Sequence, residues 1–282
     1  MKLLRYGPPG QEKPGLLDRD GKIRDLSGIV GDVDGAALAP ASLARLRAID
    51  PASLPLVSGT PRLGPCVGSV SKIVAIGLNY RLHAQEAGAA IPTEPIFFMK
   101  AISSICGPND DVIIPKGSQK TDYEVELGIV IGSLARYVAK ADARRHVAGY
   151  CVVNDVSERE FQIERGGQWT KGKSADTFCP MGPWLVTADE VPDPGKLALW
   201  TEVNGERRQN SNTGDLIFRV DEIVSYVSQF TTLLPGDVIP TGTPSGVGMG
   251  FKPPKFLKSG DRVRLSVEGL GEQNQRLVAY AG

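Results

Sequence analysis

Two carboxylates stand one residue apart inside an apolar segment, and their position makes them the first candidates for chemistry. Glu124 and Glu126 lie in residues 123–131, a segment of otherwise mostly apolar side chains. Because side chains alternate between the two faces of a strand, both acids share one face and lie close together. Two buried carboxylates repel each other and lose hydration, so this arrangement requires a shared cation or proton.

A third acid strengthens the case for a cation. Asp155 closes the apolar run 150–154, where a strand delivers a side chain to the rim of a sheet. Three oxygen ligands with open positions suit Mg²⁺ or Mn²⁺ better than Zn²⁺. The alternative is that Glu124 and Glu126 line the solvated face of an edge strand, the commoner fate of a single E-x-E pattern. The motifs below favour a metal site formed by Glu124, Glu126 and Asp155.

One of the two histidines is placed to act as a general base. His83 follows a predicted strand and precedes Glu86 by three residues, so the two side chains share a face if the segment is helical. A carboxylate beside an imidazole raises its basicity and fixes its tautomer. The alternative is a surface ion pair. His146 is expected at a solvated helix end.

Further polar residues follow in the second half of the chain. Arg159 and Gln162 come one and two helical turns after Asp155 if that strand runs into a helix, although Arg159 can instead neutralise a neighbouring glutamate. Lys173 is a candidate to stabilise an enolate. Residues 239–250 form a glycine-rich turn whose free N–H groups and hydroxyls can hold a carboxylate. This turn lacks the lysine of a nucleotide-binding loop.

The composition indicates a soluble globular protein rather than a nucleic-acid or membrane protein. The chain has 282 residues, 41% of them hydrophobic, and its 32 basic residues equal its 32 acidic ones. Neither a basic tract nor an apolar span is present, and the N-terminus breaks at proline before a signal-peptide core. Four dispersed cysteines without C-x-x-C spacing indicate buried thiols. We expect a cytoplasmic protein.

The elements that must position these side chains are mostly strands. Helical spacing is restricted to residues 43–47, 80–87, 141–146 and 220–232. Apolar runs bounded by turn residues predict strands at 1–5, 15–17, 22–25, 72–77, 96–99, 111–114, 125–131, 147–153, 183–187, 197–203, 237–240 and 262–267. Without regular strand–helix alternation, a mainly β, mixed α+β architecture with a rolled sheet is favoured.

The chain divides in two on this interpretation. Residues 50–65 are rich in proline and glycine and suit neither a helix nor a strand. We therefore expect a small N-terminal domain with its linker over residues 1–66 and a catalytic domain over residues 67–282.

Six motifs, taken in order, resemble those of the fumarylacetoacetate hydrolase family. They are Gly77-Leu-Asn-Tyr80 with His83 and Glu86, Pro95-Ile-Phe-Phe-Met-Lys100, Asp122-Tyr-Glu-Val-Glu-Leu127, Asn154-Asp155 with Arg159 and Gln162, Gly172-Lys173-Ser174, and Thr241-Gly-Thr-Pro-Ser-Gly246. The resemblance implies a β-roll catalytic domain, a small N-terminal domain and a homodimer. It also implies Mg²⁺, or Mn²⁺ or Ca²⁺, on Glu124, Glu126 and Asp155.

The resemblance assigns further roles residue by residue. His83 and Glu86 match the family's water-activating pair, and Lys173 matches a catalytic lysine that faces the substrate. The implied substrate-binding residues are Tyr80, Lys100, Arg159, Gln162, Gly242 and Thr243. Ala175 is a departure, because many relatives carry an aromatic residue or glycine there, and it alters the expected pocket shape.

The implied substrate is a small 2-oxo acid, and the implied reaction is hydrolysis of a carbon–carbon bond in a 2,4-diketo acid. His83 would deprotonate a water that attacks the C4 carbonyl, while the ion and Lys173 stabilise the departing pyruvate enolate. Residues 14–21 and 160–167 resemble members acting on 2,4-diketo-3-deoxy sugar acids. A substrate of the L-rhamnonate or L-fuconate type would give pyruvate and lactate.

Other functions remain open on the sequence. Ureidoglycolate lyase, acylpyruvate or fumarylpyruvate hydrolase and oxaloacetate decarboxylase activities suit the same motifs. A hypothesis of a different class is a non-catalytic protein that holds a metal ion on the three acids.

Overall fold

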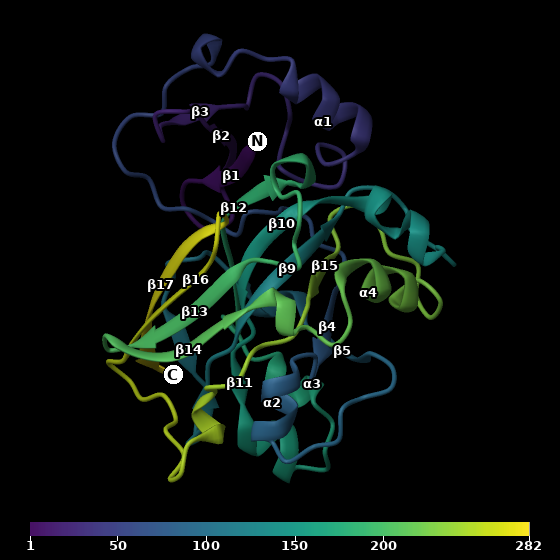
Figure 1. Cartoon of the computed structure of the whole chain (residues 1–282). Coiled ribbons are helices and arrows are strands. Elements are labelled where there is room, and N and C mark those ends of the chain that lie inside the picture. Colours follow the sequence, from purple (N-terminus) through teal and green to yellow (C-terminus); the bar gives the residue numbers. More distant parts are fainter. Residues whose placement is uncertain (282) are drawn as a thin grey trace.

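Strands dominate the computed structural model, which describes residues 1–281 (Figure 1). The helices are few and short: α1 (Pro40–Arg47), α2 (Arg81–Glu86), α3 (Thr170–Lys173) and α4 (Val220–Val227). This agrees with the predicted mainly β, α+β class. Within the described residues no helix has the length and apolar character needed to cross a membrane.

The larger sheet runs through the whole molecule. Its strand order is β3 (Ile23–Asp25), β2 (Lys13–Leu17), β1 (Lys2–Tyr6), β12 (Cys179–Thr187), β10 (Val147–Asn154), β9 (Val125–Ile131), β15 (Val238–Pro240), β4 (Ile73–Gly77) and β5 (Ile96–Lys100), and β6 (Ile105–Cys106) also pairs with β12. The N-terminal strands therefore join the main sheet through β1, although they lie in a lobe at the top of Figure 1. The predicted boundary near residue 67 remains a prediction.

A second sheet packs against the first. Its order is β14 (Glu206–Asn212), β13 (Ala198–Val203), β16 (Arg262–Val267), β17 (Gly271–Ala279) and β7 (Val112–Ile114). A small separate pair joins β8 (Thr121–Asp122) to β11 (Ser157–Glu158). These two short strands flank the segments that carry the predicted acids.

The central strand β9 is buried on both of its faces. Leu127 and Ile129 pack in a cluster with Leu265 of the second sheet and Ile223 of α4. Val130 points the other way, into a cluster shared with the leucines of the N-terminal segment. A polar side chain on either face of β9 is therefore removed from water.

The register of the sheet brings the acids together. Val125 of β9 pairs with Asn154 of β10, and the N–H of Asp155 donates to the backbone oxygen of Glu124 at 2.9 Å. On the other side of β9, Pro240 of β15 pairs with Gly128. The glycine-rich turn after β15 is thus delivered to the same end of β9 as the acids.

Several predicted elements differ in detail. The helix expected over residues 220–232 ends at Val227, and Phe230, which the predicted apolar stripe included, is 62% exposed. Residues Lys140–His146 form a 3₁₀ helix. The expected helix after Asp155 is instead β11 followed by a π-helical turn, Glu160–Glu164. Strands β14 and β17 were not predicted because most of their side chains are polar, including the buried Gln209, Gln273 and Gln275.

The β10–β12 contact that supports the acids leaves no room for a side chain at Gly149. A Cβ atom there would lie 2.2 Å from the backbone oxygen of Val186. We expect Gly149→Ala to lower the free energy of unfolding by about 2 kcal/mol or more, because backbone must shift to accept it. Gly28→Ala is the control, since its Cβ meets no atom within 4 Å. Urea unfolding that gives equal midpoints for both variants would contradict this reading of the contact.

Candidate active site

Three carboxylates meet in a buried cluster at the end of β9. Glu124 precedes the strand, Glu126 lies within it, and Asp155 follows β10. One oxygen atom of each acid lies within 4.8 Å of the others, and all three side chains are buried. Three hard oxygen donors at this separation can bind a divalent cation.

Three basic side chains partly neutralise this cluster. Lys173 Nζ lies 2.6 Å from Glu124 Oε2 and 2.7 Å from Asp155 Oδ2. Lys100 Nζ is 2.5 Å from Asp155 Oδ1, and Arg159 Nη2 is 2.7 Å from Glu124 Oε1. Burial alone would raise the pKa of Glu124, but Lys173 and Arg159 outweigh it and lower that pKa.

Glu126 is the acid without a counter-charge. Its side chain is 1% exposed, it has no ion-pair partner among residues 1–281, and Oε2 accepts a hydrogen bond of 2.7 Å from the N–H of Gly242. Burial, followed by the charges of Asp155 and Glu124, raises the pKa of Glu126 well above its usual range. A buried carboxylate among other acids fits a bound cation, since a metal ion would supply the missing charge.

Asp122 is a fourth buried acid, and the predicted set of site residues did not include it. Its side chain accepts hydrogen bonds from Arg159 Nε at 2.9 Å and from the N–H groups of Gly248 and Met249 at 2.7 and 3.0 Å. It therefore fixes Arg159 against the glycine-rich turn. One sequence feature could have identified Asp122 as a site residue. It lies two residues before Glu124, so the two side chains share one side of an extended chain.

His83 and Glu86 form a pair on α2. Nδ1 of His83 lies 2.9 Å from Glu86 Oε2, and Glu86 Oε1 accepts a hydrogen bond of 2.8 Å from the N–H of Gly246. Glu86 is thus held on both of its oxygens. Because Nδ1 faces Glu86, Nε2 of His83 is the ring nitrogen left to exchange a proton with a bound molecule.

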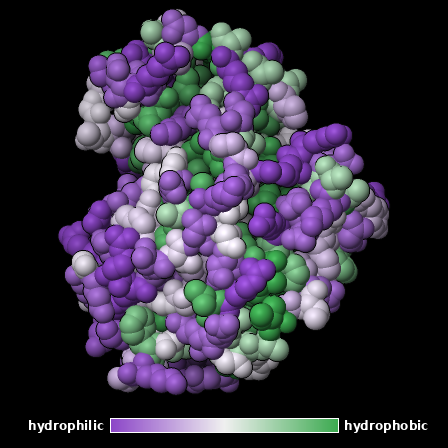
Figure 2. All heavy atoms as spheres, viewed as in Figure 1, coloured by the Kyte–Doolittle hydropathy of each residue, from purple (hydrophilic) through white to green (hydrophobic). Residues whose placement is uncertain are grey.

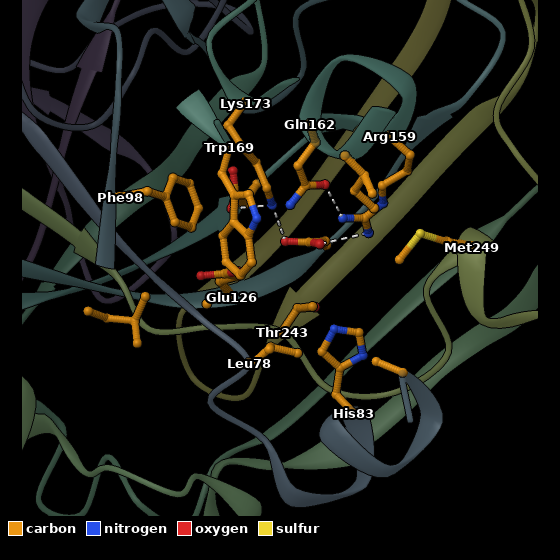
Figure 3. A pocket seen from close by; sticks show the side chains of 16 residues that line it. Leu78, His83, Phe98, Glu126, Arg159, Gln162, Trp169, Lys173, Thr243 and Met249 are labelled. Atoms are coloured by element: carbon orange, nitrogen blue, oxygen red, sulfur yellow. Dashed lines mark hydrogen bonds and ion pairs between the residues drawn. The ribbon is translucent and has the colours of Figure 1, made fainter. Parts of the chain in front are cut away.

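One cavity joins the acids to the histidine (Figure 3). Figure 3 shows Lys173, Gln162 and Arg159 on one side of the hollow and His83 with Leu78 on the other, with carboxylates between them. The predicted residues that line it are His83, Glu124, Glu126, Asp155, Arg159, Gln162, Lys173 and Thr243. The structure therefore brings together residues from five separate motifs.

Four other predicted residues lie behind this lining. Tyr80 is fully buried, and Glu86 reaches the cavity only through His83. Lys100 Nζ contacts Asp155 and the backbone oxygen of Lys173. Gly242 acts through its N–H on Glu126. Each of these residues except Tyr80 bonds directly to a side chain or backbone atom of a lining residue.

Apolar side chains complete the cavity, and the sequence analysis did not predict them as site residues, although Leu78 and Phe98 lie within two of the six motifs. They are Ile76, Leu78, Phe98, Ile163, Trp169 and Met249, with Ala87. The rings of Phe98 and Trp169 pack edge to face with centroids 5.5 Å apart. Gly77 makes room for Trp169, because a Cβ at Gly77 would lie 2.2 Å from the indole ring. The aromatic wall thus stands beside Lys173, whose Nζ is 5.3 Å from the centroid of Phe98.

Comparison with solved structures places this architecture among known enzymes. An HpcE protein from Mycobacterium smegmatis superposes with a TM-score of 0.88 at 37% identity, over 100% of both chains. Maleylpyruvate hydrolase from Sphingobium sp. SYK-6, solved with manganese(II) and pyruvate, gives a TM-score of 0.81 at 30% identity over 100% of both chains.

Sequence comparison gives the same family. A Burkholderia lata protein described only as a hydrolase is 66% identical over 276 residues, which is 98% of each chain. The family model for the fumarylacetoacetate hydrolase C-terminal domain matches residues 72–278. That match includes every residue described above in the cavity. The chain therefore belongs to the fumarylacetoacetate hydrolase family.

Proposed function

We propose that this protein hydrolyses a carbon–carbon bond in a 2,4-dioxo acid and releases pyruvate, with Mg²⁺ on Glu124, Glu126 and Asp155. The observation that carries the proposal is the single cavity in which these acids face the His83–Glu86 pair. A solved relative described as a maleylpyruvate hydrolase, with manganese and pyruvate bound, supports this class of substrate.

A divalent ion on the three acids would supply positive charge for the carboxylate and keto oxygens of the 2-oxo acid. Lys173 contributes the next cationic group. Its ammonium has three N–H donors, of which Glu124 and Asp155 take two, so one is left for the substrate. Burial alone would lower the pKa of Lys173, but Asp155 and Glu124 outweigh it and raise that pKa. The lysine stays charged and stabilises negative charge that develops on the C2 oxygen.

His83 supplies the proton transfer. With Nδ1 held by Glu86, Nε2 accepts a proton from water as the water oxygen bonds to C4. The C3–C4 bond then breaks, and its electron pair stays with the pyruvate fragment, which leaves as an enolate. The proton held by His83 ends on C3, so water and the dioxo acid become pyruvate and a second carboxylic acid.

The histidine pair favours hydrolysis over decarboxylation. Decarboxylation of oxaloacetate also forms a pyruvate enolate, but it requires no water nucleophile and no base to activate one. A 2,4-diketo-3-deoxy sugar acid of the L-rhamnonate or L-fuconate type is our preferred substrate, on the resemblance of residues 14–21 and 160–167 to members with that activity. Release of urea from ureidoglycolate, or of pyruvate from oxaloacetate alone, would contradict this assignment.

The first test is metal binding by Glu126→Gln. We expect wild-type protein to bind one Mn²⁺ per chain, and the variant to bind it at least about 100-fold more weakly, because a ligand is lost. Metal-free variant should be at least as stable as metal-free wild type, since a buried unpaired carboxylate is removed. Glu160→Gln is the control, because Glu160 pairs with Arg165 outside the cluster. If calorimetry shows that Glu126→Gln binds Mn²⁺ as tightly as the wild type does, the proposed metal site is refuted.

The second test is pyruvate release, followed with a coupled assay over diketo sugar acids, acylpyruvates and oxaloacetate, with and without a chelator. We expect His83→Ala to lower kcat by about 10²–10⁴-fold, the usual contribution of a general base, and to keep its Mn²⁺ affinity. His146→Ala is the matched control, because His146 contacts Ser133 away from the cavity. Full turnover by His83→Ala or by the chelated enzyme would refute the mechanism.

The third test concerns the orientation of Glu86. A Cβ atom on Gly250 would lie 2.4 Å from the carboxyl carbon of Glu86, so Gly250→Ala must displace that side chain from His83. We expect kcat to fall by about 10-fold or more while urea stability and Mn²⁺ affinity stay near wild type. Gly31→Ala, with open space around its Cβ, is the control. An unaltered kcat in Gly250→Ala would show that Glu86 does not position the base.

A further inference from the structure

Leu78, between β4 and α2, has a backbone conformation that is unusual for its residue type. Its φ angle is +50°, in the left-handed region that glycine favours. The conformation is strained for a leucine, because the Cβ atom crowds the following carbonyl oxygen. Such strain persists only where the surrounding structure holds the backbone in place.

The residues on either side of Leu78 hold it in this conformation. Gly77 ends β4 and has the indole ring of Trp169 packed against its Cα. On the other side, Asn79 Nδ2 donates to the backbone oxygen of Phe218 at 3.1 Å, and Asn79 Oδ1 accepts from the N–H of Phe218 at 2.8 Å. The backbone at residue 78 is therefore fixed from both directions.

The fixed backbone presents the side chain of Leu78 to the active-site cavity. Leu78 is one of the lining residues, and Figure 3 shows it beside His83, across the hollow from Lys173 and Arg159. The cavity is small, with a volume of about 100 Å³. Because its backbone is held, the Leu78 side chain cannot be displaced easily by a bulky ligand.

Two other apolar side chains of the lining are freer to adapt. Met249 is unbranched and flexible, and Figure 3 shows it close to Arg159 rather than to His83. Ile163 lies in the π-helical turn Glu160–Glu164 and is 49% exposed. Of these three side chains, Leu78 is the one that lies beside the proposed base on a fixed backbone.

We propose that Leu78 is a specificity-determining residue that limits the size of the group attached to C4 of the substrate. This inference rests on the proposed function, in which C4 approaches His83 while the 2-oxo acid end faces Glu124, Glu126 and Asp155. The group on C4 then lies against Leu78. We expect a compact group, such as the 1-hydroxyethyl group of a 2,4-diketo-3-deoxy-L-rhamnonate, to be accepted there, and a bulkier group to be rejected because the leucine cannot move.

The first test compares two uncharged groups on C4. 2,4-Dioxopentanoate carries a methyl group there, and 2,4-dioxo-5,5-dimethylhexanoate carries a tert-butyl group. We expect Leu78→Ala to raise kcat/KM for the tert-butyl substrate relative to the methyl substrate by at least about 10-fold over the wild-type ratio. Comparison of ratios cancels the intrinsic reactivity of each substrate. A smaller change in the ratio would overturn the inference.

Two further variants show whether the effect belongs to Leu78. Hydrophobic atoms are exposed in the lower half of the molecule around α2 (Figure 2), where Leu82 is 51% exposed and is not part of the cavity lining. Leu82→Ala should therefore keep the wild-type ratio. Met249→Ala enlarges the cavity near Arg159 and should change the ratio less than Leu78→Ala does. A change as large as that of Leu78→Ala in either variant would show that Leu78 is not the determinant.

Binding without turnover separates this inference from the proposed function. 2-Oxopentanoate and 2-oxo-5,5-dimethylhexanoate lack the C4 carbonyl, so hydrolysis cannot cleave their C3–C4 bond. Calorimetry on Mn²⁺-loaded protein should show that Leu78→Ala tightens binding of the tert-butyl acid by at least about 10-fold relative to 2-oxopentanoate. This change in a protein that hydrolyses no dioxo acid would refute the proposed function and keep the role of Leu78. Turnover of both dioxo acids without the change would refute only the inference.

The strained backbone has a test of its own. Because glycine is favoured over alanine at a φ of +50°, Leu78→Gly should unfold at a higher urea concentration than Leu78→Ala. The order is opposite inside a helix, so Ala44→Gly, at an exposed position of α1, should unfold at a lower urea concentration than the wild type. If Leu78→Gly is less stable than Leu78→Ala, the fixed left-handed backbone is refuted and the inference with it.

Discussion

The structure depends on the burial of more negative than positive charge at the end of one strand. Glu126 is the acid that lacks a counter-charge within the described chain, and the raised pKa of this group expresses the same deficit. Such a cluster is tolerable only if a cation or a proton completes it. The acidic cluster therefore needs a cation or a proton that comes from outside the polypeptide. Binding of an ion would stabilise the fold through the same contacts that prepare the chemistry.

The register of the strand pairing brings the three acids together. Both faces of β9 are buried, so Glu126 cannot turn to water, and the pairing of Val125 with Asn154 places Asp155 beside Glu124. The sheet that supports this cluster receives strands from the N-terminal segment as well. The placement of the three acids thus derives from long-range strand pairing rather than from local geometry.

The sequence predicted the parts of the site that obey simple periodicity. The i,i+2 spacing of Glu124 and Glu126 and the i,i+3 spacing of His83 and Glu86 correctly anticipated which side chains meet. Tertiary contacts without a local pattern were missed. The roles of Asp122 toward Arg159 and of Trp169 against Gly77 follow from segments that are distant in sequence. Strands β14 and β17 were not predicted for a related reason. Their buried glutamines, such as Gln273, which donates to a backbone oxygen, cannot be distinguished from surface residues in a sequence. The homodimer remains a prediction of the family resemblance.

The turn after β15 links three parts of the site through backbone groups. The N–H groups of Gly242, Gly246 and Gly248 bond to Glu126, Glu86 and Asp122 respectively. Because these bonds depend on spacing along the chain rather than on side chains, the insertion or deletion of one residue between β15 and Gly242 would misalign all three. During evolution, the side chains around this turn can therefore vary more freely than the length of the turn. New specificities are therefore expected to arise among the apolar side chains that line the cavity, while the number of residues between β15 and Gly248 stays fixed.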